Sequence, residues 1–200
     1  YVALDVVMAA AVGCTLLHSL DCDKSVWGLT LLDGELFVLL GHWPGRVCAY
    51  DSVTYKQLTQ FKLRSGGCFD LASCAHNRCL YIIHRSPGRV YRVEPRGRVT
   101  AEWDVKDSVS GLSVTPGHNL LVCCNKACKL KEFTQDGKLL REITLNPDMA
   151  HPQHALQLTT GQFVLCHGDS SDPVHRVCIA EDDGHPMNIY GGHKGAGPDQ

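Results

Sequence analysis

Four polar residues recur at nearly regular intervals along the chain, each directly after a run of apolar residues. They are His42, His84, Asn125 and His167, at spacings of 42, 41 and 42 residues. Imidazole nitrogens and amide oxygens can bind metal ions, so a ring of such groups brought together would form a metal site. The alternative is that each residue marks the point where a buried segment reaches water.

The spacing of packed β-sheets bears on the choice between these two hypotheses. Sheets pack face to face about 10 Å apart, whereas zinc needs imidazole nitrogens within about 2.1 Å. Equivalent positions far from a common axis therefore cannot easily converge on one ion. We therefore favour the second hypothesis, in which the four residues mark strand ends that reach water. We assign no metal and no cofactor to the chain.

Two arginines follow the same pattern. Arg46 and Arg89 lie in two copies of Pro-Gly-Arg-Val, 43 residues apart. The demands of a common turn explain the copies, because proline and glycine supply its backbone geometry. We group these arginines with the four polar residues above as a candidate ligand-binding face.

A cluster of arginines in the second quarter of the chain suggests a different ligand. Arg85, Arg89, Arg92, Arg96 and Arg98 are accompanied by a single acid, Glu94. With two tyrosines nearby, such a patch could bind RNA through phosphate charge and base stacking. We favour a solvated outer strand, since the net charge of −2 gives no general reason to expect a polyanion.

The elements that must position these residues are four copies of one unit. Leu29, Leu71, Leu112 and Leu156 open equivalent segments at spacings of 42, 41 and 44 residues. Leu17, Leu58, Val99 and Leu140 are each 41 residues apart. A period near 42 residues made only of strand-like segments is typical of a four-stranded β-propeller blade. Two-helix repeats have a similar period, but this chain lacks any long stretch with helical periodicity.

We therefore predict an all-β chain with almost no helix and about four complete antiparallel blades. The blades are expected at about 26–63, 68–105, 109–145 and 154–190, after an outermost strand at 14–21. Residues 1–13 stay unassigned, and 191–200 are expected to link to a further blade. We expect Trp27 and Trp103 to fill gaps between blades.

The innermost strands of such a fold surround an axis. The residues expected there are Gly28, Asp70, Gly111, and His154 or Ala155. One aspartate and one histidine make a poor central metal site, and the convergent titratable groups of a catalytic site are missing.

Two motifs resemble a known family. Asp136-Gly137-Lys138-Leu139-Leu140 looks like an outer hairpin, and Ile189-Tyr190-Gly191-Gly192-His193 opens a glycine-rich link. Together with the apolar second strands, they are similar to NHL-type propeller repeats over about residues 14–200. The resemblance implies a ring of six blades that binds protein or RNA. It also suggests the substrate-recognition part of a ubiquitin ligase, although the chain carries no RING or B-box spacing.

Composition limits the class of protein and the compartment in which it is found. With 44% hydrophobic and 20% charged residues, the chain is an ordinary globular protein. The uncharged segment Val6–Leu20 is shorter than the ~18 residues that a membrane-spanning helix needs, so we expect no membrane partner. The chain has 11 cysteines, an odd number, and no Cys-x-x-Cys motif. Small buried thiols in a reducing compartment explain them best, which favours a cytoplasmic protein.

The sequence therefore predicts a non-enzymatic binding module whose loop face recognises a protein, or less favourably RNA, with no small-molecule substrate. The alternative is a propeller hydrolase or lyase with a central divalent metal, similar to lactonases or amidating lyases. Because each blade is stabilised by its neighbours, we expect the chain to be part of a larger ring and to be unstable or self-associating when produced alone.

Overall fold

Antiparallel β-sheet makes up nearly all of the regular structure in the computed structural model. The structure describes residues 2–10, 13–41, 45–63, 67–168 and 175–190, with side chains from residue 19 onward. The single helical element in this part of the chain is a 3-10 turn, η1 (Pro147–Met149). The all-β prediction is confirmed. No helix among the described residues has the length and apolar character needed to cross a bilayer.

The strands form four sheets of four strands and one sheet of two. Each four-stranded sheet is called a blade, and its strands follow one another in sequence. Blade one contains β3 (Val26–Leu32), β4 (Glu35–Leu40), β5 (Arg46–Asp51) and β6 (Gln57–Lys62). Blade two contains β7 (Cys68–Cys74), β8 (Cys79–His84), β9 (Arg89–Val93) and β10 (Val99–Asp104). Blade three contains β11 (Val109–Val114), β12 (Leu120–Cys124), β13 (Lys129–Phe133) and β14 (Leu139–Thr144). Blade four contains β15 (Pro152–Gln157), β16 (Phe163–His167), β17 (Arg176–Ala180) and β18 (Pro186–Tyr190).

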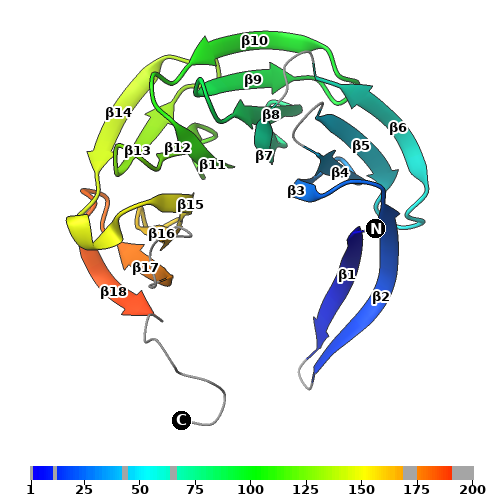
Figure 1. Ribbon diagram of the computed structural model, residues 1–200, viewed down its shortest axis with the longest axis horizontal. Coiled ribbons are helices and arrows are strands. Elements are labelled where there is room, and N and C mark those ends of the chain that lie inside the picture. Colours follow the sequence, from blue (N-terminus) through cyan, green and yellow to red (C-terminus); the bar gives the residue numbers. More distant parts are fainter. Residues whose placement is uncertain (1, 11–12, 42–44, 64–66, 169–174, 191–200) are drawn as a thin grey trace.

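The N-terminal region forms the two-stranded sheet. β1 (Val2–Ala10) pairs antiparallel with β2 (Gly13–Cys22), so the stretch that the sequence left unassigned contains a strand. Its apolar residues are consistent with a strand, but the stretch shares no position with the repeat, so the period could not locate it. In Figure 1, β2 lies on the outer side of β1.

The blades stand side by side around a common axis and form an open ring (Figure 1). The first strand of each blade, β3, β7, β11 or β15, lies nearest the axis, and the fourth strand lies on the outside. The ring is open between β18 and the β1–β2 hairpin.

Apolar side chains from facing blades fill the space between them. Val47, Val90 and Leu130 occupy the same position in the third strands of blades one, two and three. All three are fully buried between their own blade and the next one. The second strands of blades one, two and three are covered on both faces, which is why they read as continuous apolar runs.

One predicted equivalence is wrong by a single residue. The residue of blade four that is equivalent to Leu112 is Ala155. Leu112 pairs with Val122 and Ala155 pairs with Leu165, and these two partners occupy the same position of the second strand. Leu156 lies on the other face of the strand and is 50% exposed. A strand repeats every two residues, so a shift of one residue moves the side chain to the opposite face.

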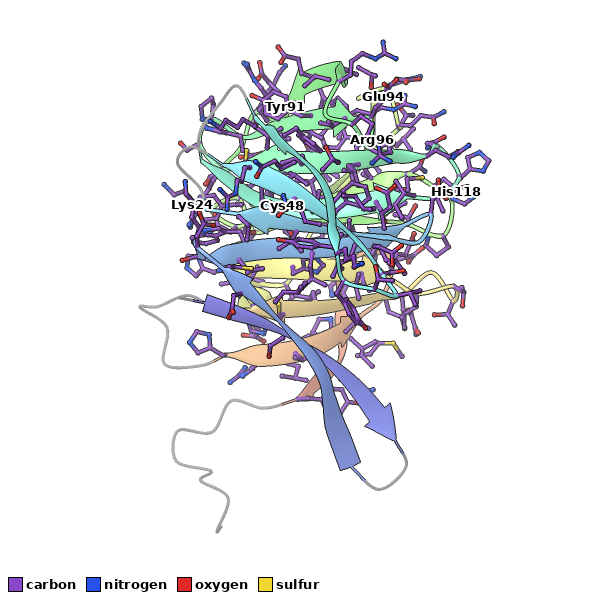
Figure 2. All side chains as sticks on the ribbon, turned by 90° about the vertical axis from the view of Figure 1, so that its right-hand side faces the viewer. Lys24, Cys48, Tyr91, Glu94, Arg96 and His118 are labelled. Atoms are coloured by element: carbon purple, nitrogen blue, oxygen red, sulfur yellow. The ribbon has the colours of Figure 1, made fainter. Side chains whose placement is uncertain are left out.

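The two faces of the ring are built from different connections. The links between blades and the turns between second and third strands lie on one face, which we call the link face. The remaining turns lie on the other face, the turn face. Figure 2 shows the ring edge-on, with Lys24 of a link at one side and His118 of a first-to-second-strand turn at the other.

The cysteines are buried thiols. Ten have described side chains; none of these ten forms a disulfide, and eight are buried. The adjacent pair Cys123 and Cys124 points into two different cores, one on each side of blade three. Burial raises the pKa of Cys68 to about 11 and that of Cys124 to about 12, so both stay protonated and unreactive near neutral pH.

We expect brief treatment of the native chain with iodoacetamide to label Cys128 and Cys166 before the eight buried thiols, because these two are partly exposed. Peptide mass spectrometry before and after denaturation measures the order, and denaturation is the control that makes every thiol available. Equally fast labelling of Cys68 and Cys124 would contradict this assignment.

Candidate functional site

The residues that the sequence singled out lie on the link face, at the ends of second strands. His84 ends β8 and faces Arg89 of β9 in register. His167 ends β16 and faces Arg176 of β17. Asn125 directly follows β12. His42 lies outside the described residues.

These side chains do not gather at one point. The Nδ1 atom of His84 lies 3.0 Å from the carbonyl oxygen of Pro87 in its own turn. Asn125 and His167 are only 5% and 4% exposed, so they offer little surface to a ligand. Among the residues with described side chains, no group of three or more His, Cys, Asp or Glu residues is arranged to hold a metal.

The two predicted arginines are ion-paired at the edge of the link face. Arg46 pairs with Asp23, and the Nε atom of Arg89 donates to Asp104 Oδ1 at 2.8 Å. Lys129 and Arg176 occupy the same position in blades three and four. The sequence analysis missed these two because their turns lack the Pro-Gly-Arg-Val motif.

The arginines of blade two do not form one patch. Arg96 donates to Glu35 from the turn face, where it holds the pKa of that carboxyl below its usual value through two hydrogen bonds. Arg98 pairs with Glu94 in the same turn, and Arg92 pairs with Asp136 of blade three. Arg85, by contrast, lies on the link face. The cluster is thus divided between the two faces and largely neutralised.

Each inner strand carries a β-bulge at its second residue, a feature that the sequence analysis did not predict. The pairing of the first and second strands skips one residue at this point in every blade. The skipped residues are Trp27, Phe69, Ser110 and Gln153. Bulges re-aim side chains and are frequent next to functional sites.

Two of the bulge residues bind the backbone, and the other two form a tilted aromatic pair. Ser110 Oγ donates to the carbonyl oxygen of Pro152 at 2.6 Å, and Gln153 Nε2 donates to that of Gly168 at 2.9 Å. The Trp27 and Phe69 rings lie 4.7 Å apart at an angle of 58°. The guanidinium carbon of Arg85 lies 4.9 Å from the centre of the Phe69 ring. We call Trp27, Phe69 and Arg85 the aromatic platform.

The platform is accessible to a ligand. Trp27 is 38% exposed, so it does not simply fill a gap, whereas Trp103 packs between Tyr81 and Phe133 as expected. Phe69 is half-buried and also packs against the core between blades two and three. No motif marks Trp27 and Phe69 in the sequence, although their spacing of 42 residues equals the repeat period.

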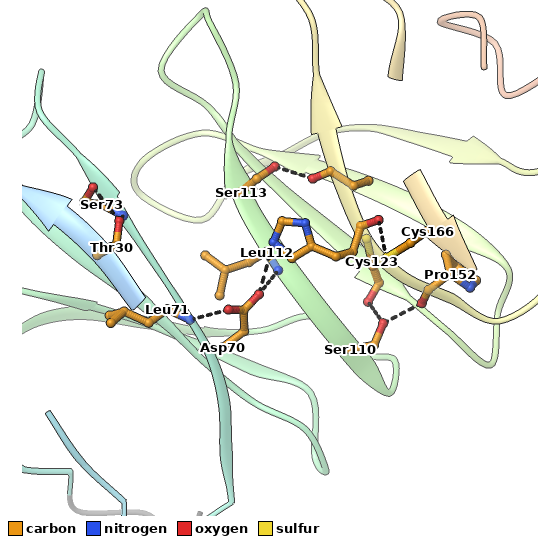
Figure 3. A network of polar contacts seen from close by, with 12 residues as sticks. Thr30, Asp70, Leu71, Ser73, Ser110, Leu112, Ser113, Cys123, Pro152 and Cys166 are labelled. Carbon is orange, nitrogen blue, oxygen red and sulfur yellow. Dashed lines mark hydrogen bonds and ion pairs between the residues drawn. The ribbon is translucent and has the colours of Figure 1, made fainter. Parts of the chain in front are cut away.

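Polar contacts join the inner strands beside the axis (Figure 3). Asp70 accepts hydrogen bonds from the backbone N–H of Leu71 at 2.8 Å and of Leu112, in the next blade, at 3.0 Å. Nε2 of His154, from blade four, lies 3.4 Å from the same carboxylate. Burial raises the pKa of Asp70 above its ordinary value, although the two amides and the imidazole oppose the shift.

The inner strands approach each other closely at this level. A Cβ atom on Gly111 would lie 2.3 Å from the carbonyl oxygen of Gln153, so only glycine fits there. Asp70 and His154 therefore hold three inner strands together, and both oxygens of the carboxylate already accept hydrogen bonds.

Comparison with solved structures decides the architecture. The chain superposes with a TM-score of 0.68 on hydrazine synthase of Kuenenia stuttgartiensis, at 17% identity over 87% of this chain and 51% of that one. An inactive variant of virginiamycin B lyase from Staphylococcus aureus gives 0.66, at 13% identity over 97% and 61%. Glutaminyl cyclase of Myxococcus xanthus gives 0.61, at 16% identity over 82% and 69%.

The chain has a β-propeller fold. It spans 51% to 64% of the first three similar structures, and at such low identity the likeness concerns the fold alone. No protein-family model and no curated protein matches the sequence. The resemblance to NHL repeats stays a hypothesis about this propeller.

Proposed function

We propose that this propeller is a non-enzymatic module that binds a protein partner through its link face, with the aromatic platform at the centre of the contact. The observation that carries the proposal is the contact of the Trp27 ring with the Phe69 ring beside Arg85, with Trp27 38% exposed. Tryptophan, tyrosine and arginine dominate the binding energy of protein interfaces. The bulges hold the two rings outside the regular ladder of their strands.

Charge on the link face supports a protein rather than RNA. The pairing of Arg46 and Arg89 with acids leaves no continuous cationic stripe for a phosphate backbone. The absence of disulfides among the ten described cysteines supports the proposed cytoplasmic location, because thiols persist in a reducing compartment. A place in an NHL-type ubiquitin ligase remains part of this proposal.

One observation favours a second candidate, a propeller hydrolase or lyase with a central metal. A histidine that binds a metal usually directs its other ring nitrogen to a carboxylate, and His154 directs Nε2 to Asp70. Elemental analysis of the full-length protein tests this. One equivalent of a divalent metal that His154→Ala removes would favour the second candidate over the first.

The proposed function predicts that Trp27→Ala in the full-length protein weakens partner binding by about tenfold to a hundredfold, because truncation of a central aromatic residue typically costs this much. The partner is first captured by cross-linking and identified by mass spectrometry, and its Kd is then measured with purified proteins. Val53→Ala is the control, since Val53 is 81% exposed in a turn-face loop. Equal affinities for Trp27→Ala and the wild type, with an unchanged circular dichroism spectrum, would refute the proposal.

A further inference from the structure

Arg85 differs from the other arginines of its blade. Arg89, Arg92, Arg96 and Arg98 each form an ion pair. Among the residues whose side chains the structure describes, Arg85 has no acidic partner, and its guanidinium lies against the Phe69 ring. Its charge is therefore available to a ligand on the link face.

The position of Arg85 is fixed by two neighbouring links. Its backbone N–H donates to the carbonyl oxygen of Gly67 at 3.2 Å, and its carbonyl oxygen accepts from the N–H of Val109 at 3.4 Å. The guanidinium itself lies against the ring of Phe69. A planar guanidinium held in this way can give two parallel hydrogen bonds to a carboxylate, which a lysine cannot.

A shallow hollow continues from Arg85 along the link face. It is lined by Ser86, Pro87, Gly88, Arg89, Asp104, Lys106, Asp107 and Ser108. Its acids are already paired, Asp104 with Arg89 and Asp107 with the buried Lys131. Lys106 is exposed and has no acidic partner within the described part of the chain. The lining contains as many acids as cations, and the two cations without an acidic partner among the described residues are Lys106 and, next to the hollow, Arg85.

We propose that the partner presents a short acidic segment to this surface. One carboxylate binds the guanidinium of Arg85, and an adjacent aromatic or aliphatic side chain packs on Trp27 and Phe69. Lys106 attracts a second acid of the segment. This inference rests on the proposed function and names the chemistry of its partner.

The anion that binds Arg85 is a carboxylate of a protein and not a phosphate of a nucleic acid. Asp23 and Asp104 lie beside the nearest paired arginines, and Asp148 lies in the link before blade four. Because Asp23 and Asp104 already neutralise Arg46 and Arg89, the face offers no row of unpaired cations to a polyanion that tracks across it. Arg85 and Lys106 can still bind a segment with one or two negative charges.

The test begins with random short peptides displayed against the full-length protein. We expect selection of sequences in which Asp or Glu stands next to Trp, Phe or Leu. The affinity of one selected peptide is then measured for the wild type, Arg85→Gln, Arg85→Lys and Trp27→Ala. Arg98→Gln is the matched control, because Arg98 is an exposed arginine of the same blade on the turn face.

Arg85→Gln should weaken binding about tenfold, since a charge-assisted bidentate pair contributes on this scale at an interface. Arg85→Lys should recover only part of the loss, and Arg98→Gln should bind like the wild type. Changing the peptide's acid to its amide should have no further effect in Arg85→Gln.

The outcomes separate the two proposals. If Trp27→Ala weakens binding but Arg85→Gln does not, the acidic segment is refuted while the proposed function stands. If neither variant changes the affinity, both are refuted. If oligouridine displaces the peptide and itself loses affinity in Arg85→Gln, the ligand is a nucleic acid and the acidic segment is again refuted.

Discussion

The 200-residue chain, produced by itself, is expected to sediment as self-associated species, and Val177→Lys is expected to reduce this association without unfolding the protein. Val177 occupies the position of Val47, Val90 and Leu130 in the other blades. Those three residues are fully buried, whereas Val177 is 45% exposed. The difference arises because no blade in the described chain covers the face of blade four that points away from blade three.

The other edge of the opening shows the same effect. Leu29 is 54% exposed, whereas Leu71, Leu112 and Ala155 at the same position are 3%, 1% and 1% exposed. Apolar side chains of blade four and of the innermost strand of blade one are thus open to solvent, while β2 covers Val38, Leu40 and Cys48 of blade one. Large exposed apolar patches favour association between molecules.

Val90→Lys is the matched control for Val177→Lys, because it places the same charge at the same position of a covered blade. Burial of an unpaired ammonium costs several kcal/mol, so this variant should fail to fold. Sedimentation velocity and thermal melting measure both effects. If Val177→Lys prevented folding as Val90→Lys does, the face of blade four that points away from blade three would have to be covered in solution.

Asp70→Leu in the full-length protein is expected to lower the free energy of unfolding by about 2–3 kcal/mol, the cost of leaving a buried N–H group without an acceptor. The N–H of Leu112 loses its partner, and the contact between blades two and three loses its central hydrogen bond. Asp70→Asn should cost less, because its amide oxygen can still accept one bond. Urea denaturation measures the losses, and Asp136→Asn at an exposed ion pair should stay within about 0.5 kcal/mol of the wild type.

The effect of Asp70 should depend on pH with a defined sign. Burial raises its folded-state pKa above the value of about 3.9 for an unfolded aspartate. Its contribution to stability is therefore complete below that pH and is lost as the pH rises through the raised pKa. The stability of the wild type relative to Asp70→Asn should be greatest in acid and fall as the pH rises. The opposite slope would mean that the hydrogen bonds to Asp70 outweigh its burial.

The repeat could be predicted because its signals are local. Apolar runs, turn residues and the 41- to 44-residue spacing all lie within short windows, and they located the four blades. The ion pairs between blades could not be predicted, since they join residues far apart in the sequence. Arg96 and Glu35, for example, are 61 residues apart and lie on different blades.

The candidate site could be predicted only in part. Strand ends placed His84, Asn125 and His167 on the correct face, but their burial was not visible in the sequence. The bulges were missed because their residues are chemically unlike one another. A bulge depends on how two strands pair, and a single strand carries no record of its partner's register.

The bulges also bear on how such a ring can change during evolution. A bulge residue lies outside the ladder of its strand, so replacing it leaves the pairing of the sheet intact. In this chain the position is tryptophan, phenylalanine, serine or glutamine in otherwise similar blades. Substitution of Trp27, the exposed bulge residue, is thus screened more by the partner than by folding, whereas Phe69, Ser110 and Gln153 also contact the core or the backbone. New specificities could arise at this position on an unchanged scaffold.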